Sequence, residues 1–257
     1  MTILITGASG YIGSRLSSYF IKKGFDVIAV CFKNNFYLSS KAWSGKLPQL
    51  INADLTNKKD IDKLSLYHVD VIIHLASLDH KESNLDIKNT SDTNVLSTWF
   101  LLDECIKNGI KKFIYFSTIH VYDENSKLPL KEDSLLSPKS VYGMTHLLSE
   151  NLVKFYRKNS ELDCVIVRLA NSYGQPIFGR ANCWSLFLND ICRQAHFDKK
   201  IIIKSDGQSY RNFVHFQDIC RGIEKIIYSD KHKQFIYNFC AKKSYRLIHI
   251  AKKVQSV

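Results

Sequence analysis

Three closely spaced glycines near the start of the chain constrain its fold more than any other feature. Gly7, Gly10 and Gly13 form the pattern GASGYIG. The pattern follows an apolar run at residues 2–6 and precedes a run of helical periodicity at residues 11–23. The first glycine permits a tight turn from strand to helix, the second lets the backbone approach a pyrophosphate, and the third lets the helix pack on the sheet. The pattern therefore predicts a dinucleotide-binding unit.

Short apolar runs alternate with amphipathic runs over the first two-thirds of the chain. This alternation indicates a parallel sheet covered by helices, so we predict an α/β fold with a Rossmann-type doubly wound sheet in residues 1–170. Residues 171–257 follow a looser pattern, from which we expect a smaller C-terminal lobe, interleaved with the first part. The expected strands are 2–6, 26–30, 71–76, 113–117, 164–170, 201–205, 212–216 and 235–240, and the expected helices are 11–23, 94–108, 140–158, 184–194, 218–228 and a last one from residue 245.

Composition narrows the class of protein and its location. The net charge is +12, but the lysines are spread along the chain in pairs, which is typical of a solvated surface and not of a nucleic-acid interface. No apolar run approaches the roughly 20 residues that a membrane helix needs. The seven cysteines lack metal-ligand spacing and suggest free thiols in a reducing compartment. We therefore expect a cytoplasmic protein without a metal, nucleic-acid or membrane partner.

The end of the second expected strand bears on the cofactor. An acid at this position holds the ribose 2′-hydroxyl of NAD, whereas a cation suits the 2′-phosphate of NADP. The strand runs into Cys31, Phe32 and Lys33, so it offers a cation and no carboxylate. This favours NADP over NAD.

Seven segments, taken in order, carry a resemblance to a known family. Together they are similar to the extended short-chain dehydrogenase/reductase superfamily, in particular to its NAD(P)-dependent nucleotide-sugar epimerases, dehydratases and reductases. The resemblance covers residues 2 to about 250 and implies a nucleotide-sugar substrate held by the C-terminal lobe, and a homodimer formed through helices 94–108 and 140–158. The segments are TGASGYIG (6–13), ADLT (53–56), HLAS (74–77), TNVLST (93–98), YFSTIHVY (115–122), RLANSYG (168–174) and SYRNFVHFQDI (209–219).

The resemblance also implies roles for individual residues. Tyr142 would be the general acid/base, and Thr118 would hydrogen-bond the same sugar oxygen. Arg211 would meet the nucleotide diphosphate, because a guanidinium binds phosphate oxygens in bidentate fashion. The implied cofactor contacts come from Gly7, Ser9, Gly10, Tyr11, Ile12, Gly13, Lys33, Asp54, Leu55, Leu75, Ala76 and Asn94, and the implied substrate contacts come from Asn171, Arg180 and Arg211.

Two departures from the family pattern bear on the reaction. Family members that dehydrate sugars place an acidic pair directly after the serine or threonine, and here that pair is Ile119 and His120. The carboxylate chemistry that eliminates water is therefore missing. The chain also ends at Val257, where the family often continues, so the lobe is short or truncated.

His146 is a further departure, because it stands where the family has a lysine four residues after the tyrosine. Residues four apart on a helix share a face, so the imidazole should lie under the phenol of Tyr142. A histidinium would lower the pKa of the phenol, whereas a neutral imidazole would not supply that charge. Either the acid/base pair is retuned or the protein no longer reacts.

These observations leave three hypotheses for the function. We favour an NADP(H)-dependent reductase of a nucleotide-linked 4-keto sugar, with Tyr142 as general acid. A nucleotide-sugar 4-epimerase with tightly bound NAD is the close alternative. A non-catalytic dinucleotide-binding protein is the third, because the family lysine is replaced by His146.

Overall fold

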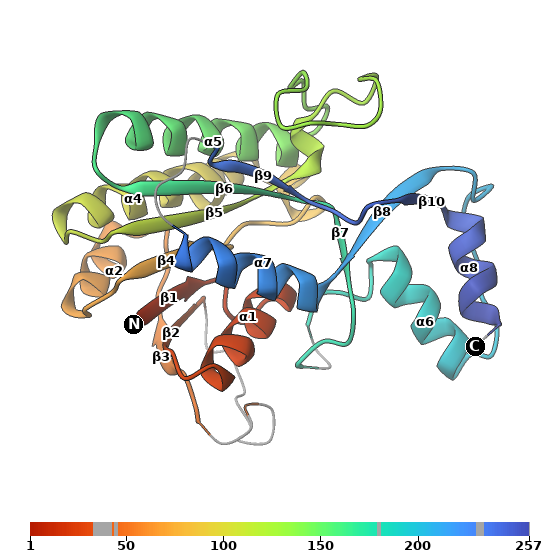
Figure 1. The fold of residues 1–257 in the computed structure, drawn as a ribbon, viewed down its shortest axis with the longest axis horizontal. Helices are drawn as coiled ribbons and strands as arrows, with labels where there is room; N and C mark the ends of the chain where they lie inside the picture. Colours follow the sequence, from red (N-terminus) through yellow and green to blue (C-terminus); the bar gives the residue numbers. More distant parts are fainter. Residues whose placement is uncertain (33–42, 44–45, 179–180, 230–233, 257) are drawn as a thin grey trace.

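A seven-stranded parallel sheet forms the centre of the molecule (Figure 1). The computed structural model describes residues 1–32, 43, 46–178, 181–229 and 234–256. Every strand pair in this sheet is parallel, and the order β3-β2-β1-β4-β5-β6-β9 confirms the predicted doubly wound fold. Its strands are β1 (Thr2–Thr6), β2 (Asp26–Cys31), β3 (Gln49–Asn52), β4 (Val71–His74), β5 (Lys112–Thr118), β6 (Asp163–Leu169) and β9 (Ile236–Phe239).

Helices cover both faces of this sheet (Figure 1). α1 (Tyr11–Lys22) and α7 (Phe216–Tyr228) lie on one face, and α2 (Lys58–Asp62), α4 (Ser97–Lys107) and α5 (Val141–Asn159) lie on the other. Successive strand residues point to opposite faces. In β1, Ile3 and Ile5 therefore join the core under α1 and α7, while Leu4 joins the core under α4 and α5.

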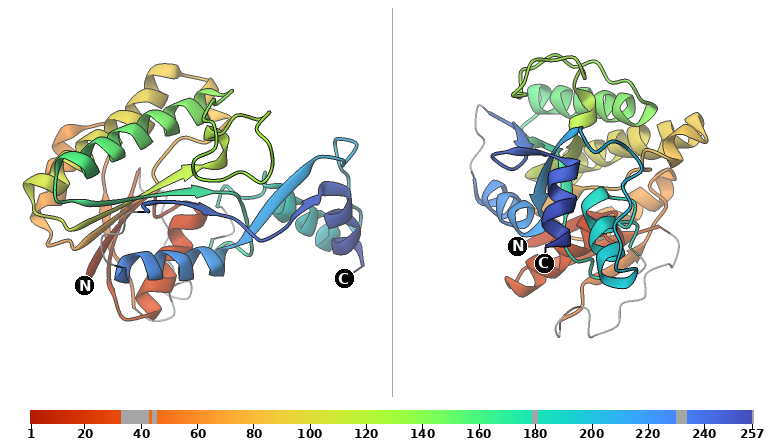
Figure 2. Two further views of the ribbon diagram at one scale, coloured as in Figure 1. Left: turned by 45° about the horizontal axis from the view of Figure 1, so that its top comes forward. Right: turned by 90° about the vertical axis from the view of Figure 1, so that its right-hand side faces the viewer.

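The C-terminal lobe projects from one end of the sheet (Figure 2). It contains a small sheet of β7 (Asn171–Tyr173), β8 (Tyr210–His215) and β10 (Ser244–Arg246), in which β8 pairs parallel with β7 and antiparallel with β10. Two helices, α6 (Phe187–Phe197) and α8 (Leu247–Gln255), pack against each other in the same lobe. Between β8 and β10 the chain returns to the main body to form α7 and β9.

The structure differs from the expected elements at several places. Residues 201–205 form no strand, because Ile202 pairs with α6 instead: its backbone N–H donates to the Gln194 side chain at 2.7 Å. The expected helix 94–108 begins with one π-helical turn. Elements not predicted from the sequence are β3, β7, β10, α2 and α3 (Ile87–Ser91), the π-helical turn η4 (Asp92–Leu96), and the 3₁₀ turns η2 (Lys63–Leu66), η3 (Glu82–Asn84) and η5 (Ile119–Val121).

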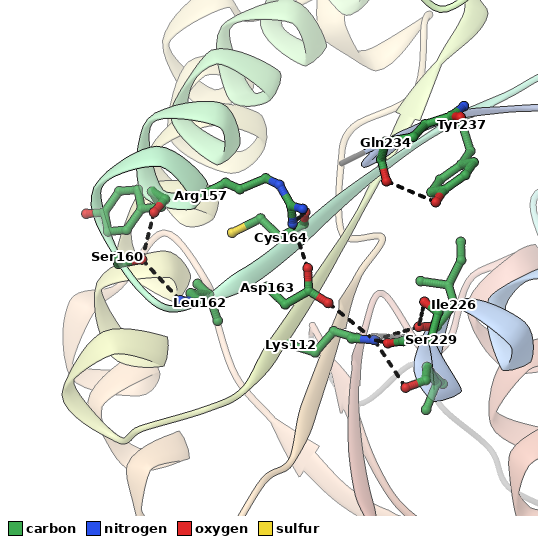
Figure 3. Close-up of polar contacts among 12 residues, drawn as sticks. Lys112, Arg157, Ser160, Leu162, Asp163, Cys164, Ile226, Ser229, Gln234 and Tyr237 are labelled. Atoms are coloured by element: carbon green, nitrogen blue, oxygen red, sulfur yellow. Dashed lines mark hydrogen bonds and ion pairs between the residues drawn. The ribbon is translucent and has the colours of Figure 1, made fainter. Parts of the chain in front are cut away.

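Buried charges join β5, β6 and α7 at the amino-terminal edge of the sheet (Figure 3). The Lys112 ammonium donates to the backbone oxygens of Ile226 and Ser229, both at 2.6 Å, and lies 3.3 Å from Asp163. Arg157 donates to the other oxygen of that carboxylate at 2.6 Å. The last carbonyls of a helix lack partners within the helix, so the ammonium caps α7. Within the described residues, no helix is long and apolar enough to cross a bilayer.

Candidate active site

Two adjoining cavities lie along the carboxyl-terminal edge of the sheet. One, of about 310 Å³, is lined by residues at or after the carboxyl ends of β1, β2, β3 and β4, and we call it the narrow cavity. The other, of about 500 Å³, is lined by residues that follow β1, β4, β5 and β6, and we call it the wide cavity. Gly7, Gly10, Leu75 and Ser77 line both, so the two form one elongated cleft. Ligands of parallel α/β sheets bind at this edge.

The glycine turn crosses the middle of the cleft. Gly7 has a φ of +63°, and a Cβ there would lie 2.9 Å from the backbone nitrogen of Ala76, so a side chain is excluded on both grounds. Gly10 caps α1 without a side-chain hydrogen bond, and the first turn of the helix has no acid. The first-turn N–H groups of Tyr11, Ile12 and Gly13 are therefore available to an anion. An elongated cleft with phosphate donors at its centre fits a dinucleotide.

The narrow cavity contains several of the expected cofactor contacts. Ser9, Asp54, Leu55 and Ala76 line it. One Asp54 oxygen accepts from the backbone and hydroxyl of Thr56, at 2.9 and 2.7 Å, which fixes the carboxylate in the cavity wall.

The side of the narrow cavity that adjoins β2 has no carboxylate among the described residues. Cys31 and Phe32 line the cavity there, as the sequence predicts. Lys33, on which the preference for NADP depended, lies outside the described part of the chain.

Tyr142, Thr118 and His146 come together in the wall of the wide cavity. β5 ends at Thr118, whose hydroxyl is close enough to Tyr142 to oppose the rise in the pKa of its phenol. Tyr142 and His146 are one turn apart on α5, and their ring centroids are 4.5 Å apart in an edge-to-face arrangement. The helix approaches the turn after β5 closely, because Gly143 has no side chain: a Cβ there would lie 2.4 Å from the His120 carbonyl oxygen.

Burial shifts both titrating groups towards their neutral forms. It raises the pKa of Tyr142 to about 12, partly opposed by the Thr118 hydroxyl. It lowers the pKa of His146 to about 4, partly opposed by Glu150. The imidazole is therefore neutral near pH 7, and it contributes a hydrogen-bonding group rather than a cation beside the phenol.

The residues behind His146 form a buried polar network. Its Nδ1 lies 2.8 Å from the hydroxyl of Tyr115, while no described residue hydrogen-bonds its buried Nε2. One turn further along α5, the Glu150 carboxylate accepts two bonds from Arg168, at 2.9 and 2.7 Å, and one from Ser117 at 2.6 Å.

Asn94, an expected cofactor contact, is in this network behind the wall and is not among the residues that line either cavity. It supports the site from behind. Its side-chain oxygen accepts from the backbone of Leu78 at 2.8 Å, and its amide donates to Thr145 at 3.0 Å. Asn94 is in the π-helical turn, and its carbonyl oxygen also accepts from Ser149 at 2.7 Å. It therefore holds the loop after β4 against α5.

The three expected substrate residues are placed differently from one another. Asn171 lines the wide cavity and donates to the backbone oxygen of Asn212 at 2.9 Å. Arg211 is exposed, donates to the backbone oxygen of Tyr210 and does not line the wide cavity. The pKa of His120 is lowered mainly by burial, and the charge of Arg211 adds to this effect. Arg180 lies outside the described residues.

Sequence reasoning missed a group of side chains in the wall that faces Tyr142. Asp79, His80 and Lys81, from the loop after β4, line the wide cavity together with His120, which follows β5. The rings of His80 and His120 lie 6.2 and 6.1 Å from that of Tyr142. Their place in the sequence could have indicated these residues, because the loop after β4 and the turn after β5 both lie beyond the carboxyl ends of central strands, where ligands bind.

Comparison with known proteins places this geometry among enzymes of nucleotide sugars. Residues 3–240 match the NAD dependent epimerase/dehydratase family. A protein named as a UDP-glucose 4-epimerase from Methanocaldococcus jannaschii is 30% identical over 85% of this chain and 71% of its own length. A dTDP-D-glucose 4,6-dehydratase from Dictyostelium discoideum is 28% identical over 99% of this chain and 62% of its own length.

Solved structures agree with this assignment. The UDP-glucuronic acid 4-epimerase of Bacillus cereus, in complex with UDP-glucuronic acid and NAD, is 28% identical with a TM-score of 0.81. The UDP-glucose 4-epimerase of Thermotoga maritima, with UDP-glucose, is 25% identical with a TM-score of 0.84. Each match covers the whole of this chain and 82% of the other.

Proposed function

Because the chain belongs to the NAD-dependent epimerase/dehydratase family, we propose that it is an NAD-dependent 4-epimerase of a nucleotide-linked sugar. The observation that carries this proposal is the pairing of Tyr142 with Thr118 in a cavity wall that has Ile119 and His120 where dehydration needs acids. Two relatives with epimerase names support the same choice.

The residues of the wide cavity support a proton exchange at one sugar oxygen. Tyr142 reacts as the phenolate, so its own proton has to leave first. The phenolate then takes the proton of the sugar hydroxyl at the reacting carbon, and the resulting phenol returns that proton after the sugar has presented its other face. Thr118 donates to the phenol oxygen as the proton leaves, which stabilises the phenolate. When bound, NAD would supply the reversible two-electron oxidation of the carbon. A cavity of about 500 Å³ leaves room for the sugar to turn.

The same geometry allows a reductase, the function that the sequence favoured. The absence of a carboxylate beside Cys31 and Phe32 in the narrow cavity is the observation that supports NADP(H). Against it, the solved Bacillus cereus relative holds NAD. We therefore propose NAD as the cofactor and treat NADP-dependent reduction as the second candidate.

The nucleotide that co-purifies with the protein separates these functions. The released nucleotide should be identified by mass after denaturation of the native protein. We expect NAD, in an amount close to one per chain. NADP, together with rapid oxidation of NADPH on addition of a 4-keto nucleotide sugar, would support the reductase and contradict the epimerase. Bound NAD without turnover of any nucleotide sugar would support the non-catalytic hypothesis.

The outer faces of α4 and α5 support a homodimer. Large apolar side chains are exposed along both helices, with Trp99 46%, Leu148 47% and Phe155 60% exposed in the single chain. Apolar patches of this kind mark protein interfaces. We propose that two copies pair through these helices, and that Phe155→Glu converts a dimer into a monomer in light scattering. A wild type that is monomeric at micromolar concentration would contradict the proposal.

A further inference from the structure

The residue at the family's lysine position is held by a second buried side chain. The Tyr115 hydroxyl and His146 Nδ1 are 2.8 Å apart, and the two residues are 3% and 2% exposed. Tyr115 is in β5 and faces α5, so the contact joins the strand that ends at Thr118 to the helix that carries Tyr142. The bond therefore fixes the orientation of the imidazole within the active-site wall.

The direction of this hydrogen bond follows from the surroundings of Tyr115. Burial raises the pKa of its hydroxyl well above 10, so the hydroxyl keeps its proton at neutral pH. A buried O–H requires an acceptor, and His146 Nδ1 lies at hydrogen-bonding distance. The neighbouring Ser149 hydroxyl donates its own proton to the carbonyl of Asn94, at 2.7 Å, and its proximity partly opposes the rise in the pKa of Tyr115. Among the described residues, the hydrogen bond at the Tyr115 oxygen is the one to His146 Nδ1. If Nδ1 accepts, the neutral ring carries its proton on Nε2.

Nε2 is the polar atom that the protein leaves without a partner. It is buried, and no described residue hydrogen-bonds it. Since Nδ1 faces Tyr115, Nε2 points away from that residue, and His146 lines the wide cavity beside Tyr142. A buried donor of this kind is stabilised when a ligand oxygen accepts from it.

We propose that Tyr115 is a positioning residue that holds His146 as the Nε2–H tautomer, so that a neutral hydrogen-bond donor replaces the family's lysine. The ligand atom that accepts from it is a hydroxyl oxygen of the bound dinucleotide. The tautomer follows from the protein alone, whereas its use in binding rests on the proposed function. In this site the imidazole acts through a directed hydrogen bond and supplies no charge.

The tautomer can be read directly by nuclear magnetic resonance. Protein with ¹⁵N-labelled histidine should be observed at pH 7.5, and the His146 signals assigned by their loss in His146→Gln. We expect a protonated Nε2 and an unprotonated Nδ1. In Tyr115→Phe, the ring should shift towards a mixture of tautomers. The control is Tyr156→Phe, further along α5, which removes a hydroxyl that hydrogen-bonds Asp103 of α4. It should leave the His146 signals unchanged.

Binding of NAD⁺ tests the use of this donor. The amide nitrogen of glutamine can occupy the position of Nε2, whereas that of asparagine occupies the position of Nδ1. We therefore expect His146→Gln to keep the affinity for NAD⁺ within about threefold, and His146→Asn and Tyr115→Phe to weaken it about five- to tenfold, as for one lost hydrogen bond.

The possible outcomes distinguish this inference from the proposed function. A protonated Nδ1 or a doubly protonated ring in the wild type would overturn the inference, even if Tyr115→Phe fails to fold. Unchanged His146 signals in a folded Tyr115→Phe protein would also overturn it. An Nε2–H tautomer in a protein that binds neither NAD⁺ nor NADP⁺ would uphold the tautomer and refute its use and the proposed function.

Discussion

The buried polar groups at the two ends of β5 differ in whether they have hydrogen-bond partners within the protein. At the amino-terminal end, the Lys112 ammonium contacts three backbone oxygens of α7 and its C-cap and one oxygen of Asp163, and Arg157 holds the other carboxylate oxygen (Figure 3). At the carboxyl-terminal end, His146 is also buried, yet its Nε2 has no partner among the described residues. The first end is complete in the protein, and the second is complete only with a ligand.

This difference separates stability from function within one strand. An unsatisfied buried polar group costs free energy and persists where function requires it. A satisfied network of buried charges stabilises the fold only while both partners remain. Substitutions at the amino-terminal end should therefore change the free energy of unfolding, and those at the carboxyl-terminal end should change turnover.

Tyr142→Phe should have the largest effect. Removal of the phenol hydroxyl removes the general acid/base, so kcat should fall about 10³-fold, while the midpoint of thermal unfolding stays within a few degrees of the wild type. Tyr156→Phe, on the outer part of the same helix, should retain full turnover. A Tyr142→Phe protein with more than a tenth of the wild-type kcat would contradict the role of Tyr142 as the general acid/base at the carboxyl-terminal end of β5.

Lys112→Met should reduce the free energy of unfolding by about 3 kcal/mol, because it leaves buried carbonyls of α7 without a donor. Urea unfolding measures this change. The neighbouring Lys111 is exposed, and Lys111→Met should change the free energy by less than about 0.5 kcal/mol. Turnover per folded molecule should be unchanged in both. A large loss of kcat in Lys112→Met would show that the two ends are coupled.

Acid should destabilise the protein through its buried histidines. Burial lowers the pKa of His146 to about 4 and that of His74 to about 3. Below pH 6.5 the histidines therefore bind protons in the unfolded state but not in the folded state. The free energy of unfolding that they contribute is fully present above pH 6.5 and is lost as pH falls towards 4. Each histidine should contribute about 1.4 kcal/mol per pH unit in that range.

A matched pair of variants isolates the His146 contribution. His146→Gln should reduce the slope of unfolding free energy against pH, measured by urea denaturation between pH 6.5 and 5. His68→Gln, at a side chain that is 92% exposed, should leave the slope at the wild-type value. Equal slopes in all three proteins would mean that His146 is not held neutral by burial.

His146→Lys should raise the rate at neutral pH by about tenfold, a smaller change than that of Tyr142→Phe, and should shift the pH dependence of kcat. A buried ammonium beside the phenol would lower the pKa of Tyr142, so the rise of kcat with pH should move to lower pH by about one unit. His146→Gln, which adds no charge, should leave that rise in place. An unchanged profile in the lysine variant would contradict the paired action of residues 142 and 146.

The sequence predicted the features that depend on local pattern. Gly7 requires a residue without a side chain, and the positions of Tyr142 and Thr118 follow from a helix and a strand whose periodicity is clear, so all three lie as expected. The expected strand at 201–205 was wrong because an apolar run forms a strand only where a partner strand is available. The short strand β3 was missed because its residues are mostly exposed.

The parts of the site that depend on loops and on burial were not predictable. Asn94 stands in a π-helical turn that directs its side chain to Leu78 and Thr145, behind the cavity. Lys81 reaches the wide cavity only through the path of a loop. The neutral state of His146 depends on its burial and on its bond to Tyr115, which no spacing in the sequence shows.

The central claim is that the carboxyl-terminal end of β5 completes an epimerase site, and ¹H nuclear magnetic resonance of nucleotide sugars tests it most directly. The purified protein, with NAD⁺ added, should be incubated separately with UDP-glucose, UDP-galactose, UDP-glucuronic acid and UDP-galacturonic acid. We predict that one pair interconverts to the same equilibrium mixture from either side, without net change in absorbance at 340 nm, and that Tyr142→Phe abolishes the conversion. Stoichiometric consumption of NADPH with a 4-keto nucleotide sugar, and no epimer from any of the four sugars, would contradict the claim.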